Sequence, residues 1–181
     1  MLKRYQQPTF WRNLALYFMV FSFVGHWLEI GAVYFAKFFL HHETGYGILD
    51  NFTEPYNIYG LGAVVCILVA VTLPKRITKN ICLEYAVNVV ICAVVEYVSA
   101  LVIVWRFGKN IFWDYSDLPF NLNGHICLTN SLLFGLVATF FMRIVYPFLE
   151  KCLAKIHPKL LNLIFVAVAV IFIYFTAVYW Q

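Results

Sequence analysis

The stretch that decides the fold is ICLEYAVNVVICAVVEYVSALVIVW, residues Ile81–Trp105. A helix of about 20 apolar residues crosses the hydrocarbon core of a bilayer, and this run is long enough to do so. It also contains Glu84 and Glu96, which are costly to place in hydrocarbon unless the protein supplies partners for them. We therefore expect a membrane-spanning helix with one polar face.

The composition of the whole chain agrees with this expectation. Of its 181 residues, 63% are apolar and only 12% are charged, whereas a soluble domain carries about 25% charged residues. The mean hydropathy is +0.79. We predict an all-α, polytopic membrane helix bundle, with residues 1–181 forming a single integral membrane domain. Its five transmembrane helices are expected at roughly 14–39, 56–73, 81–105, 126–145 and 160–180.

The first apolar run and the cysteines exclude other classes of protein. The first run is too long for a cleaved signal peptide, contains His26 and Glu29, and lacks an A-x-A site. The five cysteines show no CxxC spacing, so they indicate neither a disulfide framework nor a zinc motif. The net charge of +4 is explained by membrane topology, and we expect no nucleic-acid partner.

The basic residues predict the orientation of the chain. Ten of the 13 Lys and Arg residues lie before the first span or in the two connections that share its side of the membrane. The positive-inside rule therefore places the N-terminus in the cytoplasm and the C-terminus outside. With that orientation, the connection at residues 106–125 faces outward.

Polar residues within the spans predict a pocket. At 1.5 Å per residue, Glu29 and Glu96 each lie about 22 Å from the inner boundary of the core. Asn130 lies about 6 Å below the outer surface by the same rise, so the three residues share a depth. His26 is one turn below Glu29 on the same helix face. We expect these side chains to form one polar pocket in the outer half of the membrane.

The third span carries a polar stripe at every fourth residue: Glu84, Asn88, Cys92 and Glu96, continued by Ser99 and Arg106. Residues four apart lie on one face of a helix. The stripe fits either hydrogen bonding between packed helices or the lining of a pathway. We favour helix packing for the stripe as a whole, and a functional or structurally essential buried carboxylate at Glu96.

The segment WDYSDLPFNLNGHICL, residues Trp113–Leu128, is unusually rich in hydrogen-bonding side chains for a connection between two spans. Its Pro and Asn-Gly pairs are turn signals, so a self-capped re-entrant turn is one interpretation. The other is a lid that folds back over the first and third spans and completes the pocket. That lid would contribute Asp114, Tyr115, Asp117, Asn121, Asn123 and His125, with Arg106 as counter-ion of Asp114 or Asp117.

His26 and Glu29 form an H-x-x-E pair. Di-iron helix bundles use Glu-x-x-His pairs on two facing helices, but this sequence has only one such pair. We therefore expect neither a metal site nor another cofactor.

Five stretches carry a resemblance to a known family. They are FSFVGHWLEI at Phe21–Ile30, YNIYGLG at Tyr56–Gly62, the LEY and VEY sequences around Glu84 and Glu96, and above all WDYSDLPFNLNGHICLTNSLLFG at Trp113–Gly135. The chain resembles the bacterial integral membrane family labelled putative ABC-transporter type IV, or putative ABC transporter permease. The family pattern has Trp where His26 stands and Arg where His125 stands, so neither histidine is expected to be a family-wide ligand.

The resemblance implies solute transport by a multi-pass protein of the bacterial cytoplasmic membrane. The chain contains no ATP-binding P-loop, so an ATPase would be a separate subunit. Five spans are few for a transport pathway, which favours a homodimer or such a partner subunit.

Three functions remain open. The first, which we favour, is a transport or solute-binding subunit whose pocket residues bind a small polar or cationic solute. The second is an intramembrane enzyme that uses a buried Glu and a His for acid–base chemistry on a lipid or lipid-linked substrate, so that a lipid headgroup would fill the pocket. The third is a non-catalytic assembly protein. The sequence contains no G-x-S-x-G or H-E-x-x-H motif, which leaves the enzyme hypothesis without a signature.

Overall fold

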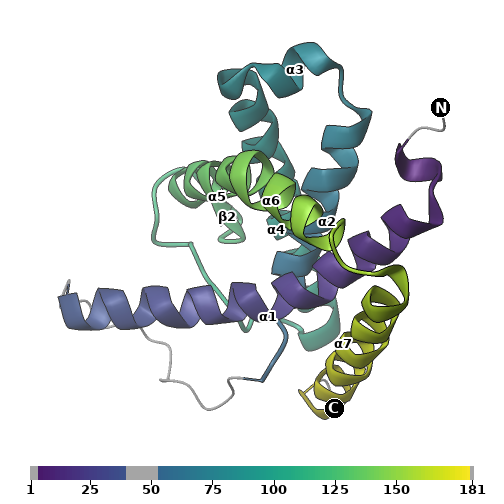
Figure 1. Ribbon diagram of the computed structural model, residues 1–181. Helices are drawn as coiled ribbons and strands as arrows, with labels where there is room; N and C mark the ends of the chain where they lie inside the picture. The colour runs from purple at the N-terminus through teal and green to yellow at the C-terminus, as the bar shows by residue number, and fades with distance from the viewer. Residues whose placement is uncertain (1–3, 40–52, 180–181) are drawn as a thin grey trace. The chain divides into compact units, whose positions relative to one another are not determined.

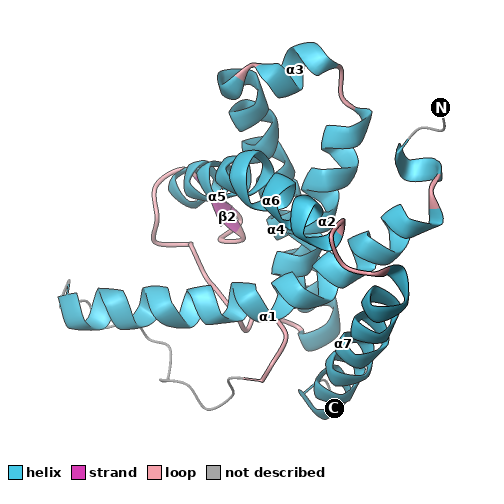
Figure 2. Ribbon diagram, viewed as in Figure 1, coloured by secondary structure: helices cyan, strands magenta, loops and turns pink. Residues whose placement is uncertain are grey.

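The computed structural model describes residues 4–39 and 53–179, and 80% of these described residues are helical (Figures 1 and 2). It divides into two compact units. The first consists of Met1–Val64 with His157–Gln181, and the second of Val65–Ile156. The predicted all-α class is confirmed, apart from one two-stranded turn in the second unit.

The first unit contains the 3-10 helix η1 (Arg4–Gln6), α1 (Pro8–Phe39), the start of α2 (Asn57–Thr72) and α7 (Pro158–Tyr179). Helices α1 and α7 pack through edge-to-face rings, with Phe172 of α7 between Phe18 and Phe23 of α1. Near the N-terminal end of α1, Arg12 donates to Asn162 Oδ1 at 2.8 Å. Aromatic packing, together with this polar contact, joins the two helices.

Helix α2 crosses α1 at glycine. A Cβ on Gly25 would overlap the Tyr59 ring, and a Cβ on Gly60 would overlap the Phe18 carbonyl and Ser22 Oγ. The Tyr56 amide donates to the Ser22 carbonyl at 3.0 Å just before α2 begins. Small residues allow two membrane helices to approach this closely. The crossing brings the first turn of α2 against the middle of α1.

The second unit contains the rest of α2, α3 (Lys75–Lys79), α4 (Ile81–Phe107), strands β1 (Asn121–Leu122) and β2 (Ile126–Cys127), α5 (Leu128–Phe140), the π-helix η2 (Phe141–Val145) and α6 (Tyr146–Leu153). Helix α4 is capped at both ends. The Asn80 side chain accepts from the Cys82 and Leu83 amides, and Gly108 ends the helix in the left-handed conformation. The predicted third span therefore begins at the expected residue and extends two residues beyond Trp105.

Helices α4 and α5 form the main contact of the second unit. Gly135 faces Val89, and a Cβ at that position would lie 2.9 Å from Val89 Cα. The close approach lets Tyr85 donate its hydroxyl to the Leu132 carbonyl of α5 at 3.1 Å. A glycine in α5 thus sets the distance between the two helices.

The predicted fourth span, 126–145, ends near Val145, but the helix that begins at Leu128 continues past that residue. It continues through the π-helix into α6 and ends at Leu153. Pro147, in the first turn of α6, cannot donate the hydrogen bond of an α-helix. A π-helical turn before it lets the helix continue, because its bonding pattern is wider.

Four segments within the described residues are long and apolar enough to cross a membrane: Pro8–Ala32, Ile81–Phe107, Leu128–Leu153 and Pro158–Tyr179. Helix α2, the expected second span, is also apolar but has only 16 residues. The polytopic helical architecture is therefore shown. The count of five spans, the orientation of the termini and the single domain stay predictions.

Replacing Gly135 with alanine tests the packing of α4 on α5. We expect Gly135→Ala to lower the free energy of unfolding by about 1–3 kcal/mol, because the new methyl group meets Val89 backbone rather than a movable side-chain end. Gly62→Ala in α2 is the matched control, since nothing lies within 4 Å of its added Cβ. The control should be neutral or slightly stabilising. Thermal unfolding in detergent measures both, and equal midpoints would contradict the close contact.

Candidate functional site

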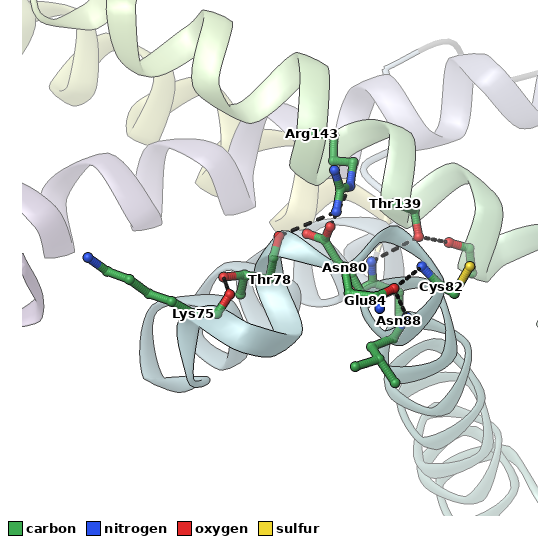
Figure 3. A network of polar contacts seen from close by, with 10 residues as sticks. Lys75, Thr78, Asn80, Cys82, Glu84, Asn88, Thr139 and Arg143 are labelled. Atoms are coloured by element: carbon green, nitrogen blue, oxygen red, sulfur yellow. Dashed lines mark hydrogen bonds and ion pairs between the residues drawn. The ribbon is translucent and has the colours of Figure 1, made fainter.

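Glu84 lies at the end of the polar stripe that the sequence predicts to be cytoplasmic, and it forms an ion pair. Glu84 is buried, and its Oε2 lies 2.6 Å from Arg143 Nε of the π-helix η2. Arg143 also donates to the Thr78 carbonyl at 3.3 Å, at the end of α3. Figure 3 shows Arg143 pointing at both partners. The sequence analysis counted Arg143 only among the basic residues that orient the chain, so this ion pair was missed.

The middle of the stripe is occupied by neutral partners. The Asn88 amide donates to Thr139 Oγ1 at 3.0 Å, and that hydroxyl donates to the Gly135 carbonyl at 2.7 Å (Figure 3). One turn further on, the Cys92 thiol contacts that of Cys66 in α2. Both cysteines are free thiols. Up to this point the stripe holds helices together, which supports the packing interpretation.

Glu96 differs from the residues below it. Its side chain is 5% exposed, and the Tyr115 hydroxyl donates to Oε1 at 2.9 Å. The other oxygen, Oε2, is buried and has no hydrogen-bond partner among the described residues. A buried polar atom without a partner is rare in native proteins and calls for a specific explanation. Glu96 therefore has a buried oxygen with bonding capacity to spare.

The connection after α4 is built to hold Tyr115 in place. The Tyr115 amide donates to the Gly124 carbonyl at 2.9 Å, across the turn formed by β1 and β2. Gly124 has a φ of 69°, and a Cβ there would overlap Ser116 Oγ and crowd Asp114 Oδ1. Asn121 accepts from the Gly124 amide at 3.0 Å. Both the conformation and the space at this turn require glycine.

The Asp114 carboxylate is hydrogen-bonded within the turn. Ser116 donates its hydroxyl and its amide N–H to Asp114 Oδ1, at 2.6 and 2.9 Å. These two hydrogen bonds, with a smaller contribution from nearby His125, lower the pKa of Asp114 below its usual value. The self-capped turn considered from the sequence is thus present at Asp114.

The connection also folds onto α4 beside Glu96. Asn123 donates to the Tyr97 hydroxyl at 3.0 Å, and the His125 ring lies 5.8 Å from the Tyr97 ring. The Trp113 indole donates to the His125 carbonyl at 2.8 Å. The prediction that this segment folds back over the third span is confirmed for Tyr115 and Asn123.

Two expected partners are not where the sequence placed them. In the part of the chain that the structure describes, Arg106 forms no ion pair with Asp114 or Asp117, and its guanidinium lies 5.5 Å from the Phe107 ring centroid. Ser116 already donates hydrogen bonds to Asp114 within a local turn. That turn forms without holding a long side chain such as that of Arg106 in one conformation. The Asn130 side chain forms no hydrogen bond within the described ranges, and Tyr115 bonds Glu96 instead. Asp117 is exposed.

The first unit contains a second carboxylate–tyrosine pair. Tyr59 donates its hydroxyl to Glu29 Oε2 at 2.8 Å, and the His26 ring lies edge-on to Tyr56 with centroids 4.1 Å apart. His26 Nδ1 is buried without a partner among the residues described. The sequence reasoning missed both tyrosines. The signal that would have found them is spacing, since His26 and Glu29 lie three residues apart on one face of α1. Tyr56, just before α2, and Tyr59, in its first turn, have the same spacing.

Glu29 and Glu96 belong to different units. The structure describes each unit by itself, so the predicted approach of the two carboxylates stays a prediction. What the units share is the chemistry of the pair, an acidic side chain within an apolar helix that accepts from a tyrosine hydroxyl.

Comparison with protein families decides the classification. The family model described as Putative ABC-transporter type IV matches residues 16–179. The chain belongs to this family. No curated protein and no solved structure matches it. The resemblance seen in the sequence is confirmed, and it extends beyond Glu150 into α7.

Membership of the ABC-transporter type IV family, together with the long apolar helices, makes the chain a multi-pass membrane protein of transport type. The segment Trp113–Gly135, which carries most of the resemblance, contains Tyr115, the turn that holds it and Gly135 of α5. The family's most recognisable sequence is thus the part that covers Glu96 and fixes α5 on α4.

The hydrogen bond between Tyr115 and Glu96 can be tested by removing each partner. We expect Tyr115→Phe to lower the free energy of unfolding by about 1 kcal/mol. Tyr174→Phe, on an exposed ring of α7, is the control. Glu96→Gln should be milder than Glu96→Leu, because the amide can still accept from the tyrosine. Equal thermal midpoints for the Gln and Leu variants would contradict a hydrogen-bonded carboxyl.

Proposed function

We propose that the chain is the membrane subunit of a transporter and that Glu96, together with Tyr115, binds a small polar or cationic solute. The unpartnered Oε2 of Glu96 carries this proposal. Tyr115 is a neutral donor, so it orients the carboxyl without neutralising it. An ionised carboxylate inside a membrane needs a positive partner or several donors, and a solute that supplies one of these completes the site.

The other predicted pocket residues differ in how many of their hydrogen-bonding groups are already occupied. Asp114 and Asn121 are used within the turn and Asn123 by Tyr97, so these three hold the loop in position. Glu29 with Tyr59, and His26 with its unpartnered Nδ1, give the first unit groups of the same chemistry. We assign Glu29 and His26 to solute binding as well. Asn130, Asp117, His125 and Arg106 are left as candidates for the rim.

The membrane topology is part of the same proposal. Helix α2, with Tyr56 and Leu73 flanking it, serves as a short second span, since a bilayer thins locally around a helix shorter than its core. Five spans then place the N-terminus in the cytoplasm, and the Trp113–His125 loop faces the outside of the bacterial cytoplasmic membrane. The basic helix α3 lies on the cytoplasmic side.

The partners are those that a transporter of this type requires. A transporter of ABC type hydrolyses ATP, and this sequence holds no P-loop. We therefore propose a separate ATPase subunit, with a homodimer as the simplest way to double five spans. The bilayer is the remaining partner.

Topology is tested by cysteine labelling of intact cells. We expect Lys109→Cys, an exposed position in the connection after α4, to react with a membrane-impermeant maleimide added outside. Lys79→Cys at the end of α3 should react only after the membrane is opened, because basic connections stay in the cytoplasm. Wild-type protein measures the background from the free native cysteines. The reverse pattern of labelling would overturn the orientation.

The solute site is tested by binding to purified protein. We expect at least one of ammonium, methylammonium, choline, sodium or potassium to raise the unfolding midpoint of the wild type. Glu96→Gln should weaken that effect by about tenfold or more, equivalent to the loss of about 1.4 kcal/mol of binding free energy. Glu54→Gln removes the same charge outside the spans and is the control. The proposal fails if no cation stabilises the wild type while neutral glycerol does, or if Glu96→Gln binds equally well.

A further inference from the structure

Several polar side chains of the Trp113–Leu128 connection form hydrogen bonds within the protein. Asn121 donates to the Ser116 and Leu118 carbonyls at 3.1 and 2.8 Å. Asn123 reaches Tyr97 on α4, and the Asp114 carboxylate accepts from Ser116. Side chains that would be expected to meet water therefore bond within the connection itself and to α4.

The apolar side chains of the same connection point outward. Leu118, Phe120 and Leu122 are 42%, 82% and 51% exposed. They alternate along the chain with Pro119 and Asn121, so they project from one short stretch, here called the apolar tip. A connection bathed in water usually buries such side chains, since burying apolar surface is the main favourable term in folding. The apolar tip calls for an apolar neighbour.

The backbone at the tip is held in place at a cost. Phe120 has a φ of 55°, in the left-handed region that residues other than Gly, Asn and Asp rarely adopt. The Leu128 amide donates to the Phe120 carbonyl at 3.3 Å, and the bonds of Asn121 close the turn on the other side. Strain at a bulky exposed residue persists only where the surrounding structure imposes it. The surrounding structure thus imposes the left-handed backbone conformation at the exposed Phe120.

The position of the connection identifies the neighbour. Helices α4 and α5, which it joins, both belong to segments long and apolar enough to cross the membrane. A connection between two spans lies at the boundary between water and hydrocarbon. Trp105, near the end of α4, is 84% exposed, as expected for an indole at a membrane interface. The carbonyls of Leu118, Phe120 and Leu122 accept from Asn121, Leu128 and His125, which lowers the penalty for entering a lipid layer.

We propose that Leu118, Phe120 and Leu122 insert into the interfacial layer of the adjoining bilayer leaflet and anchor the connection there. The partner is the phospholipid bilayer itself. The anchor lies in the same rigid turn as Tyr115, so it keeps that hydroxyl on Glu96. The inference does not depend on which solute, if any, the chain carries.

Site-specific photocrosslinking tests the contact directly. The full chain is prepared with Phe120→p-benzoylphenylalanine in nanodiscs of phosphatidylethanolamine and phosphatidylglycerol, irradiated, and weighed by intact mass spectrometry. We expect a phospholipid adduct at position 120. The same amino acid at Asp117, an exposed position in the same connection, should give none. A crosslinked dimer, a crosslink within the chain, the absence of any adduct at 120, or equal lipid adducts at both positions overturns the proposal.

Hydrogen exchange then separates anchoring from strain. Phe120→Asn keeps a residue that tolerates the left-handed conformation but removes the apolar ring, whereas Phe120→Leu keeps apolar character. In nanodiscs we expect Phe120→Asn to speed amide exchange across Trp113–Leu128 by about five- to tenfold, with Phe120→Leu close to the wild type. Equal rates in all three proteins, or equal acceleration in both variants, would show that the ring's contact with lipid does not hold the connection.

Discussion

The absence of water in the hydrocarbon core is the constraint on which the second unit depends. A polar side chain there has to find its partner within the protein, and α4 carries such side chains along one face from Glu84 to Glu96. The partners come from η2, α5 and the connection before it: Arg143, Thr139 and Tyr115. Because the three contacts lie at successive heights on one face, they fix the rotation and the register of α5 on α4 together. Apolar packing alone would leave both free to slide, since lipid tails are as apolar as leucine.

Two features of α5 and η2 exist to satisfy that register. Gly135 lets the backbones approach closely enough for Asn88 to reach Thr139. The π-helical turn contains Arg143 and precedes Pro147. A π-helical turn inserts about one extra residue, so it rotates the next helical turn by about 100° relative to a continuous α-helix. The turn accommodates the proline and at the same time sets the face from which Arg143 meets Glu84. One irregularity in the helix thus serves two requirements.

The sequence could identify a residue as important only where its polarity departed from that of its neighbours. Glu96 stands out because it is acidic within an apolar run, and Tyr115 because its segment is polar between two such runs, so both were found. The partner of Glu84 was not found, because counting basic residues gives the side of the membrane but not which carboxylate an arginine meets. Tyr59 was overlooked because a tyrosine is a common residue in an apolar helix and does not stand out from its neighbours. The role expected for Arg106 failed for a different reason, since a local bond from Ser116 satisfied Asp114 first.

Glu84 and Glu96 lie on one face of one helix, about 18 Å apart at 1.5 Å per residue, and yet they differ in kind. Glu84 meets a guanidinium, so its charge is neutralised by the fold and it has no need of a ligand. Glu96 meets only a hydroxyl, which offers one hydrogen bond and no charge. Its second oxygen is buried among side chains that offer it no hydrogen bond. A protein that needed two structural carboxylates could have paired both in the same way. The helix instead closes one end with an ion pair and leaves a carboxylate oxygen without a partner at the other, and the proposed solute site rests on that difference.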